Sequence, residues 1–152
     1  MNYVYEILSN KILLAAFFGW LSAQFLKTVI YVLVNKEFNP ERLMGDGGMP
    51  SSHSATVMAL VTSTAFYYSF SSFEFAVSAI MALIVMHDAM GVRRETGIQA
   101  KVINNMMDWF QEMDSDIPVE EKLKEFVGHT PLQVLFGALL GIVVGIIVCN
   151  IL

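Results

Sequence analysis

The sequence predicts an all-α integral membrane protein: a bundle of four transmembrane helices with an amphipathic helical insertion before the last span. Two observations predict this fold class. Hydrophobic residues make up 55% of the 152-residue chain, which is high for a soluble domain but ordinary for a chain surrounded by lipid. They gather in long apolar runs, and about 20 such residues form a helix that crosses a hydrocarbon core roughly 30 Å thick. A chain of this length normally forms one domain, so residues 1–152 are expected to fold as a single membrane-embedded unit.

Four apolar runs satisfy this criterion in order along the chain. The expected spans are Ile12 to Val34, Ser54 to Phe70, Phe73 to Met90 and Leu132 to Leu152, each with approximate ends. The second and third are short and are separated by Ser71 and Ser72, which indicates a tight helical hairpin. A signal peptide is the alternative for the first run, but no basic segment precedes it and no clear small-residue cleavage site follows.

A polar insertion, about residues 93–130, separates the last two spans. Apolar residues recur at spacings near three and four from Gln99 to Met113, which predicts an amphipathic helix. Its methionine and aromatic stripe is expected to pack in the core, with a place in the headgroup layer as the alternative. A turn from Asp114 to Pro118 and a short charged helix from Val119 to Phe126 complete the insertion.

Composition also limits the partners. The net charge is −5 and no basic run is present, so the electrostatic footprint of a nucleic-acid-binding protein is missing. Cys149 is the single cysteine, which excludes an intrachain disulfide and a cysteine-based metal site. A thin four-helix bundle buries limited area, so we expect a homodimer surrounded by membrane lipids.

A glycine-rich stretch, Gly45 to His53, runs directly into the second apolar run. Glycines let backbone amides approach an anion, Pro50 suits the first helical position, and Ser51 or Ser52 can cap the free amides. The helix dipole adds to the attraction, so this terminus is a candidate phosphate site with His53 in its first turn. The structural alternative is a capped helix start with an interfacial histidine.

Cations and a second histidine are expected at the same face of the membrane. Lys27 lies in the last two turns of the first span, where a cation needs an anion or the interface. Arg93 and Arg94 follow the third span, and His129 precedes the fourth. Interfacial anchoring would explain an isolated cation, but convergence with the glycine loop favours a phosphate site, which Arg42 would join.

Three ordered motifs resemble the divergent branch of the type 2 phosphatidic acid phosphatases (PAP2), a superfamily that also contains vanadium haloperoxidases. The motifs are GGMPSSHSA at 47–55, DAMGVRR at 88–94 and GHTP at 128–131, and the resemblance covers nearly the whole chain. The superfamily pattern has a lysine and an arginine, then Pro-Ser-Gly-His, then an arginine followed by a histidine and an aspartate. The matching residues are Lys27 and Arg42, then Pro50 to His53, then Arg93 or Arg94 with His129.

This sequence departs from the pattern in two places that bear on activity. Ser52 replaces the glycine before the first histidine, and Gln133 stands where the aspartate that orients the second histidine would fall. A glutamine can accept a hydrogen bond from an imidazole but cannot stabilise an imidazolium as a carboxylate does. Asp88 or Asp116 are the alternative sources of that charge.

The resemblance implies a lipid phosphatase that hydrolyses a phosphomonoester or pyrophosphate through a phosphohistidine. Neutral His129 would attack phosphorus, and His53 would protonate the leaving oxygen and then activate water. The mechanism needs neither a metal nor a cofactor. The residues expected to bind substrate and stabilise charge are Lys27, Arg42, Gly47, Gly48, Ser51, Ser52, Asp88, Arg93 and Arg94.

The expected partner is a lipid phosphate, because the cations stand at span ends near the membrane surface. Phosphatidylglycerophosphate is preferred, with phosphatidate and polyprenyl pyrophosphate as alternatives. Nearly all lysines and arginines lie on the active side, so the positive-inside rule predicts a cytoplasmic active face, in a bacterial plasma membrane. A catalytically silent lipid- or anion-binding scaffold is the alternative function, and a transporter is a third class for which the spans carry little charged material.

Overall fold

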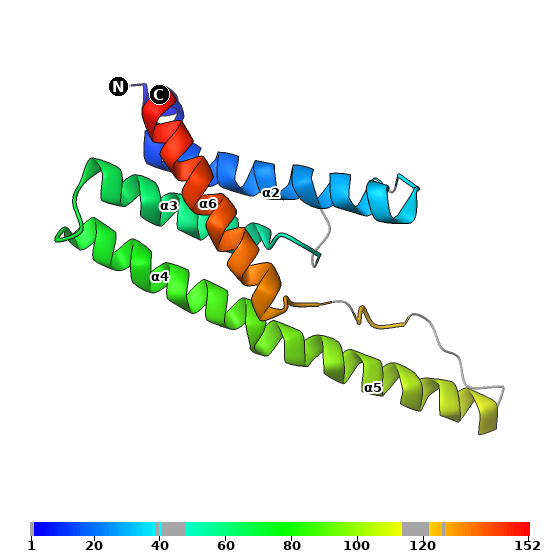
Figure 1. Ribbon diagram of the computed structural model, residues 1–152. Coiled ribbons are helices and arrows are strands. Elements are labelled where there is room, and N and C mark those ends of the chain that lie inside the picture. Colours follow the sequence, from blue (N-terminus) through cyan, green and yellow to red (C-terminus); the bar gives the residue numbers. More distant parts are fainter. Residues whose placement is uncertain (1, 39, 41–47, 114–121, 126) are drawn as a thin grey trace.

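A computed structural model describes residues 2–38, 40, 48–113, 122–125 and 127–152. Within these ranges the regular structure is helical throughout, so the predicted all-α class is confirmed. The helices are α1 (Tyr3–Leu8), α2 (Lys11–Asn35), α3 (Ser52–Tyr67), α4 (Phe73–Met90), α5 (Val92–Met113) and α6 (Pro131–Ile151). The two ends of the chain lie together at one end of the bundle, where α2 begins and α6 ends (Figure 1).

Helix α3 is the centre of the bundle, because it packs against α2, α4 and α6. Figure 1 shows α6 crossing α3 diagonally. This close approach depends on glycines at every fourth position of α6, since a Cβ atom on Gly137 or Gly141 would collide with a carbonyl oxygen of α3. A Cβ on Gly145 would lie 2.9 Å from Cβ of Thr62, also on α3. Small residues at this spacing let membrane helices pack backbone to backbone.

Three helical stretches are long and apolar enough to cross a membrane: Lys11–Asn35, Phe73–Met113 and Pro131–Ile151. The expected span from Ser54 to about Phe70 corresponds to α3, which has 16 residues, begins at Ser52 and ends at Tyr67. At 1.5 Å per residue it measures about 24 Å, less than the roughly 30 Å of a hydrocarbon core. The prediction of four full spans is therefore met by three helices. The fourth is a shorter helix inside the bundle.

The serines and threonines of α3 can lie inside an apolar bundle because their hydroxyl groups are hydrogen-bonded within the helix. Its hydroxyl groups donate to carbonyl oxygens of the preceding turn, as Thr56 does to Ser52 at 2.7 Å and Ser63 does to Ala59 at 2.8 Å. These internal bonds satisfy polar groups without water. The expected hairpin follows, and Ser72 caps α4 by accepting a hydrogen bond from the amide of Phe75 at 3.1 Å.

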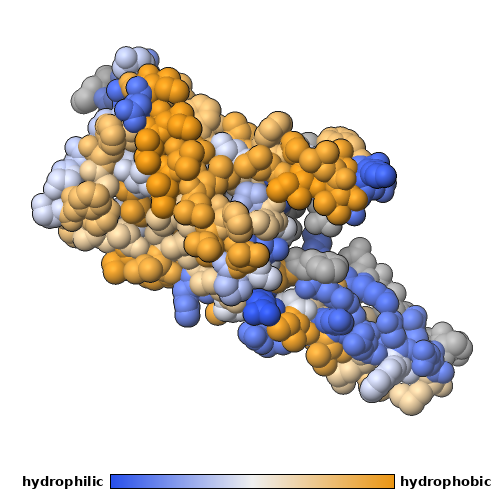
Figure 2. All heavy atoms as spheres, viewed as in Figure 1, coloured by the Kyte–Doolittle hydropathy of each residue, from blue (hydrophilic) through white to orange (hydrophobic). Residues whose placement is uncertain are grey.

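Large apolar side chains remain exposed on the outer helices, as expected of a surface that faces lipid. They include Phe17, Leu21 and Phe25 on α2, Ile80 and Ile84 on α4, and Leu135, Leu139 and Val143 on α6. Figure 2 shows α6 and the far end of α2 as mostly hydrophobic surface. The same view shows α5 with a hydrophilic band beside a hydrophobic edge.

Helix α5 confirms the predicted amphipathic helix, but the stripe is not core. After Gly91 it continues beyond the bundle in line with α4 (Figure 1). Apolar residues such as Val102, Met106 and Trp109 are exposed, so the predicted core packing of this stripe is wrong. The bundle ends where α4 ends and leaves this face without a covering element among the described residues.

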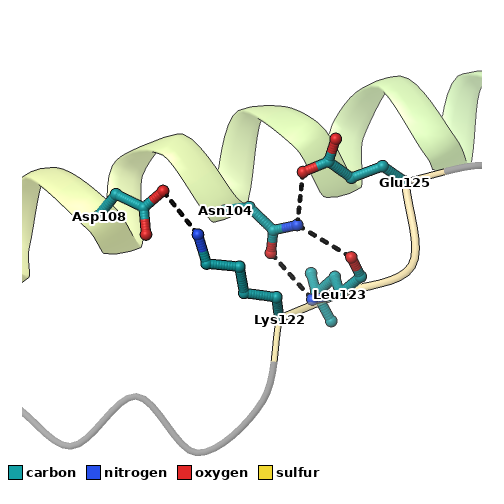
Figure 3. Close-up of polar contacts among 5 residues, drawn as sticks. All are labelled: Asn104, Asp108, Lys122, Leu123 and Glu125. Atoms are coloured by element: carbon teal, nitrogen blue, oxygen red, sulfur yellow. Dashed lines mark hydrogen bonds and ion pairs between the residues drawn. The ribbon is translucent and has the colours of Figure 1, made fainter.

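The polar face of α5 is covered by the returning chain, residues 122–125 (Figure 3). Asn104 is 2% exposed and accepts from the amide of Leu123 while donating to its carbonyl oxygen, both at 2.9 Å. The amide of Asn104 also donates to Glu125 at 2.9 Å. The predicted charged helix is therefore wrong for these residues, because the backbone groups of Leu123 bond to a side chain instead of to a helical turn. The remaining residues of that prediction, and the turn predicted from Asp114 to Pro118, lie outside the described residues.

Candidate active site

The two predicted histidines meet at the end of the bundle where α3 and α6 begin. His53 lies in the first turn of α3, and His129 lies just before α6. Their ring centroids are 5.8 Å apart. The position of His129 is set by its own amide, which donates to the carbonyl oxygen of Ala89 at the end of α4 at 2.9 Å. Contacts from three helices therefore converge on one pair of imidazoles.

Ser51 is the N-terminal cap of α3, a role that was expected of Ser51 or Ser52. Its hydroxyl accepts from the amide of Ser54 at 3.3 Å, and its own amide donates to the carbonyl oxygen of Gln133 at 3.0 Å. Pro50 precedes the cap, so the prediction that it takes the first helical position is wrong. Because Ser51 is fully buried and its amide is bonded to α6, the structure places it in the joint between two helices.

Gln133 fixes the orientation of His129. The amide of Thr130 donates to Oε1 of Gln133 at 3.0 Å, and a backbone N–H can only donate, so that atom is the acceptor oxygen. The same oxygen lies 3.3 Å from Nδ1 of His129, which must therefore bear a proton. In the neutral ring the basic lone pair is then on Nε2. Gln133 stands in the capping box of α6, with Thr130 as its cap, so its place is set by the helix start itself.

A cavity of about 330 Å³ opens beside His129. Its walls come from α5, the returning chain, the glycine loop and the start of α6. The lining residues are Gly48, Arg94, Gly97, Ile98, Lys101, Glu125, Val127, Gly128, His129, Thr130 and Gln133. Two cations and one carboxylate therefore border the same space as the imidazole. Such a cationic site suits a phosphate group.

Two glycines bring the returning chain onto the start of α5. Gly128 has φ +88°, a conformation that side chains disfavour, and a Cβ there would collide with the amide of Arg94. A Cβ on Gly97 would lie 2.9 Å from the carbonyl oxygen of Val127. Glycine at both positions therefore allows the chain to pack on α5, so that His129 and Arg94 line the same cavity.

Lys27 packs against Gly48, in the glycine-rich stretch before α3. It is 5% exposed, and a Cβ on Gly48 would lie 3.2 Å from its Cγ. Gly48 has φ +80°, so glycine is required for both space and conformation. Because Gly48 lines the cavity, the lysine stem packs directly behind one of its walls.

Other expected residues are not brought to this cavity. Arg93 forms an ion pair with Asp88 at 3.1 Å, and both side chains are 44% exposed. Asp88 borders an apolar groove beside α4 instead. Ser52 lies with His53 at a second cavity, of about 210 Å³. Arg42, Gly47 and Asp116 lie outside the described residues.

Lys101 and Glu125 line the cavity and were not predicted. Lys101 follows Arg94 by seven residues, close to two helical turns, so both lie on one face of the amphipathic helix. This spacing could have identified Lys101 from the sequence. The position of Glu125 depends on the contact of the returning chain with Asn104, for which the sequence has no local pattern.

Comparison with known proteins identifies relatives of this chain by sequence. The model of the divergent PAP2 family matches residues 8–144. A protein of Bacillus subtilis (strain 168), named "Uncharacterized membrane protein YuiD", is 41% identical over 151 residues, which cover 93% of this chain and 96% of that protein. No solved structure matches.

Proposed function

Because this chain belongs to the divergent PAP2 family, we propose that it is a membrane lipid phosphatase that works through a phosphohistidine on His129. The observation that supports this most is the contact between Gln133 and Nδ1 of His129. It directs the lone pair of the neutral ring to Nε2, the nitrogen available for attack. Arg94 and Lys101 line the same cavity, where they would bind the phosphate oxygens.

The reaction proceeds in two displacements. Nε2 of His129 attacks phosphorus, the bond from phosphorus to the ester oxygen breaks, and protonated His53 donates its proton to that oxygen. Water then attacks the phosphohistidine, His53 takes a proton from the water, and inorganic phosphate leaves as His129 is regenerated. The ring centroids are 5.8 Å apart, which is close enough for both imidazoles to act on one phosphate ester.

Positive charge at the site is provided by three side chains from two helices, α2 and α5. Arg94 and Lys101 line the cavity from α5, and Lys27 packs behind the glycine loop from α2. Cations placed before the reaction starts stabilise negative charge that develops on the phosphoryl oxygens. The sequence suggested Arg93 and Arg94 together as phosphate ligands. The proposal keeps Arg94 in this role and leaves Arg93 out.

The substrate is a lipid phosphomonoester or pyrophosphate, with phosphatidylglycerophosphate preferred. The cavity borders the start of α6, at one end of a stretch that is long and apolar enough to cross a membrane, which is the level expected of a lipid headgroup. The bias of lysines and arginines toward this side supports a cytoplasmic active face, and the proposed location is the plasma membrane.

The test is release of inorganic phosphate from a panel of lipid phosphates by the purified protein in lipid nanodiscs. Wild type is expected to release phosphate from at least one member, and His129→Ala to release none. His87→Ala is the matched control, because His87 borders the apolar groove beside α4 and should retain wild-type activity. A His129→Ala protein as active as wild type would reject the mechanism.

A silent anion-binding scaffold is the second candidate, and the neutral Gln133 is the observation in its favour. An amide leaves the imidazolium of a phosphohistidine less stabilised than a carboxylate would. A scaffold would bind vanadate in the cavity with an affinity that falls in Arg94→Ala, yet would release no phosphate from any lipid of the panel.

A further inference from the structure

A second cavity, of about 210 Å³, lies beside the other histidine of the pair. It borders His53, whereas the cavity already described borders His129, and the two share no lining residue. Helices α2, α3 and α4 enclose it. Its lining residues are Trp20, Gln24, Ser52, His53, Thr56, Val57 and Val85.

Gln24 is the unusual member of this lining. It is 6% exposed, and its Oε1 is buried without a hydrogen-bond partner among the residues that the structure describes. A buried polar atom in this state is unfavourable unless something pairs with it. Thr56 does not serve, because its hydroxyl donates to the carbonyl oxygen of Ser52 at 2.7 Å. The oxygen of this amide could therefore accept a hydrogen bond from a molecule bound in the cavity.

The position of Gln24 on α2 relates it to the phosphate site. Lys27, behind the glycine loop, lies one turn nearer the end of α2, and Trp20 lies about one turn deeper in the bundle. Each turn advances about 5 Å along the axis. Passing into the bundle along this face, a bound molecule would meet a cation, then an amide, and then an aromatic ring. The headgroup of phosphatidylglycerophosphate begins in the same order, with a terminal phosphate followed by the hydroxyl-bearing carbon of its glycerol.

We infer that this cavity binds the leaving alcohol of the substrate and that Gln24 recognises a hydroxyl group on it. The inference rests on the proposed function, in which His53 protonates the ester oxygen of that alcohol. A hydroxyl both donates and accepts, so it can pair with either end of a glutamine amide. The substrate class is then a phosphate ester of a lipid polyol, with a free hydroxyl near the ester carbon. Phosphates of simple long-chain alcohols lack this group.

The experiment compares phosphatidylglycerophosphate with its analogue that lacks only the free hydroxyl of the headgroup glycerol. Wild type should show a kcat/KM at least about tenfold higher for the hydroxylated lipid, because the analogue leaves the buried amide unpaired. Gln24→Met has a side chain of similar length and cannot form this bond. It should reduce the preference to within about twofold, because the two lipids can no longer be distinguished by this bond.

Thr28→Val is the matched control, since Thr28 is a buried polar residue on α2, one turn from Gln24, that borders neither cavity. It should retain the preference. Equal hydrolysis of the two lipids by wild type would overturn the inference, because the hydroxyl would then not be recognised. It would leave the phosphatase assignment standing. This comparison needs no variant, so it decides even if Gln24→Met fails to fold.

A binding measurement separates this inference from the proposed function. Phosphatidylglycerol, the dephosphorylated lipid, should bind the protein more tightly than its deoxy analogue, and Gln24→Met should remove the difference. If neither phosphate ester is hydrolysed but this difference is present, the phosphatase proposal fails and hydroxyl recognition by Gln24 stands. Equal binding of the two alcohols by wild type would overturn that recognition.

Discussion

The side-chain oxygen of Gln133 lies 3.3 Å from Nδ1 of His129 and accepts a hydrogen bond from that ring. The same oxygen accepts from the amide of Thr130, so the contact is part of the N-terminal cap of α6. A residue that normally only closes a helix therefore also orients an imidazole. The neutral amide selects the tautomer of His129 without adding charge beside it.

This relationship predicts opposite effects for two substitutions of Gln133. Gln133→Leu removes the acceptor, so kcat should fall at least about 10²-fold as His129 loses its tautomer and orientation. Gln133→Glu keeps the cap, since glutamate is a favoured residue at this position of a capping box. Its carboxylate favours the protonated, non-nucleophilic ring, so the acid limb of the pH profile of kcat/KM should move to higher pH. An unchanged pH profile in Gln133→Glu would show that Gln133 does not act on His129.

Neighbouring arginines should differ sharply in importance. Arg94→Ala removes a cation that lines the cavity, so both turnover and vanadate binding should fall, by at least about tenfold each. Arg93→Ala removes only a half-exposed ion pair with Asp88, of the kind that is worth about 0–1 kcal/mol. Its activity should stay near that of wild type. The reverse order, measured in one phosphate-release assay with both variants, would contradict the site described here.

Asn104 should control the returning chain that leads to His129. Asn104→Leu removes three part-buried hydrogen bonds to Leu123 and Glu125, of a kind worth about 0.5–1.5 kcal/mol each. Hydrogen exchange should become faster in residues 122–130, and turnover should fall because the wall of the cavity is loosened. Lys122→Ala is the control, since its ion pair with Asp108 is exposed and weak. Protection of residues 122–130 equal to wild type in Asn104→Leu would refute this role.

Close packing of α6 on α3 predicts a strong response to one methyl group. Gly141→Ala directs its Cβ at the carbonyl oxygen of Ala55, so the helices must separate, at a cost of about 1–3 kcal/mol. Leu139→Ala, on the exposed face of α6, should change stability much less. Thermal unfolding in detergent measures both. A melting temperature for Gly141→Ala equal to that of wild type would mean that the two helices are not packed this closely.

Much of the fold could be predicted because hydropathy alone reports membrane-spanning helices. The start and end of α4 matched, whereas α3 ends at Tyr67, three residues before the predicted end. Its serines and threonines make it less apolar than α2, α4 and α6, and hydroxyl groups such as those of Thr56 and Ser63 are satisfied by bonds within the helix. The exposure of the α5 stripe could not be predicted, because amphipathic periodicity identifies an apolar face but not what covers it.

The candidate site was predicted as far as topology determines it. His53, His129 and Arg94 lie near helix starts that meet at one end of the bundle, so their convergence follows from the order of the helices. Lys101 and Gln24 were missed for different reasons. Lys101 required knowing which face of α5 meets the cavity, and Gln24 resembled any polar residue in an apolar helix until its burial was seen.

The most direct test of the mechanism is isolation of the phosphorylated protein. Wild type, quenched within one turnover of a lipid phosphate, should contain an acid-labile, base-stable phosphate that peptide mass spectrometry assigns to His129. His53→Ala should still form this adduct from a substrate with a good leaving group and should release it at least about 10²-fold more slowly, since the general base for water is gone. His129→Ala should contain none. Phosphate release by wild type with no phosphohistidine, or with the phosphate on His53, would contradict the account.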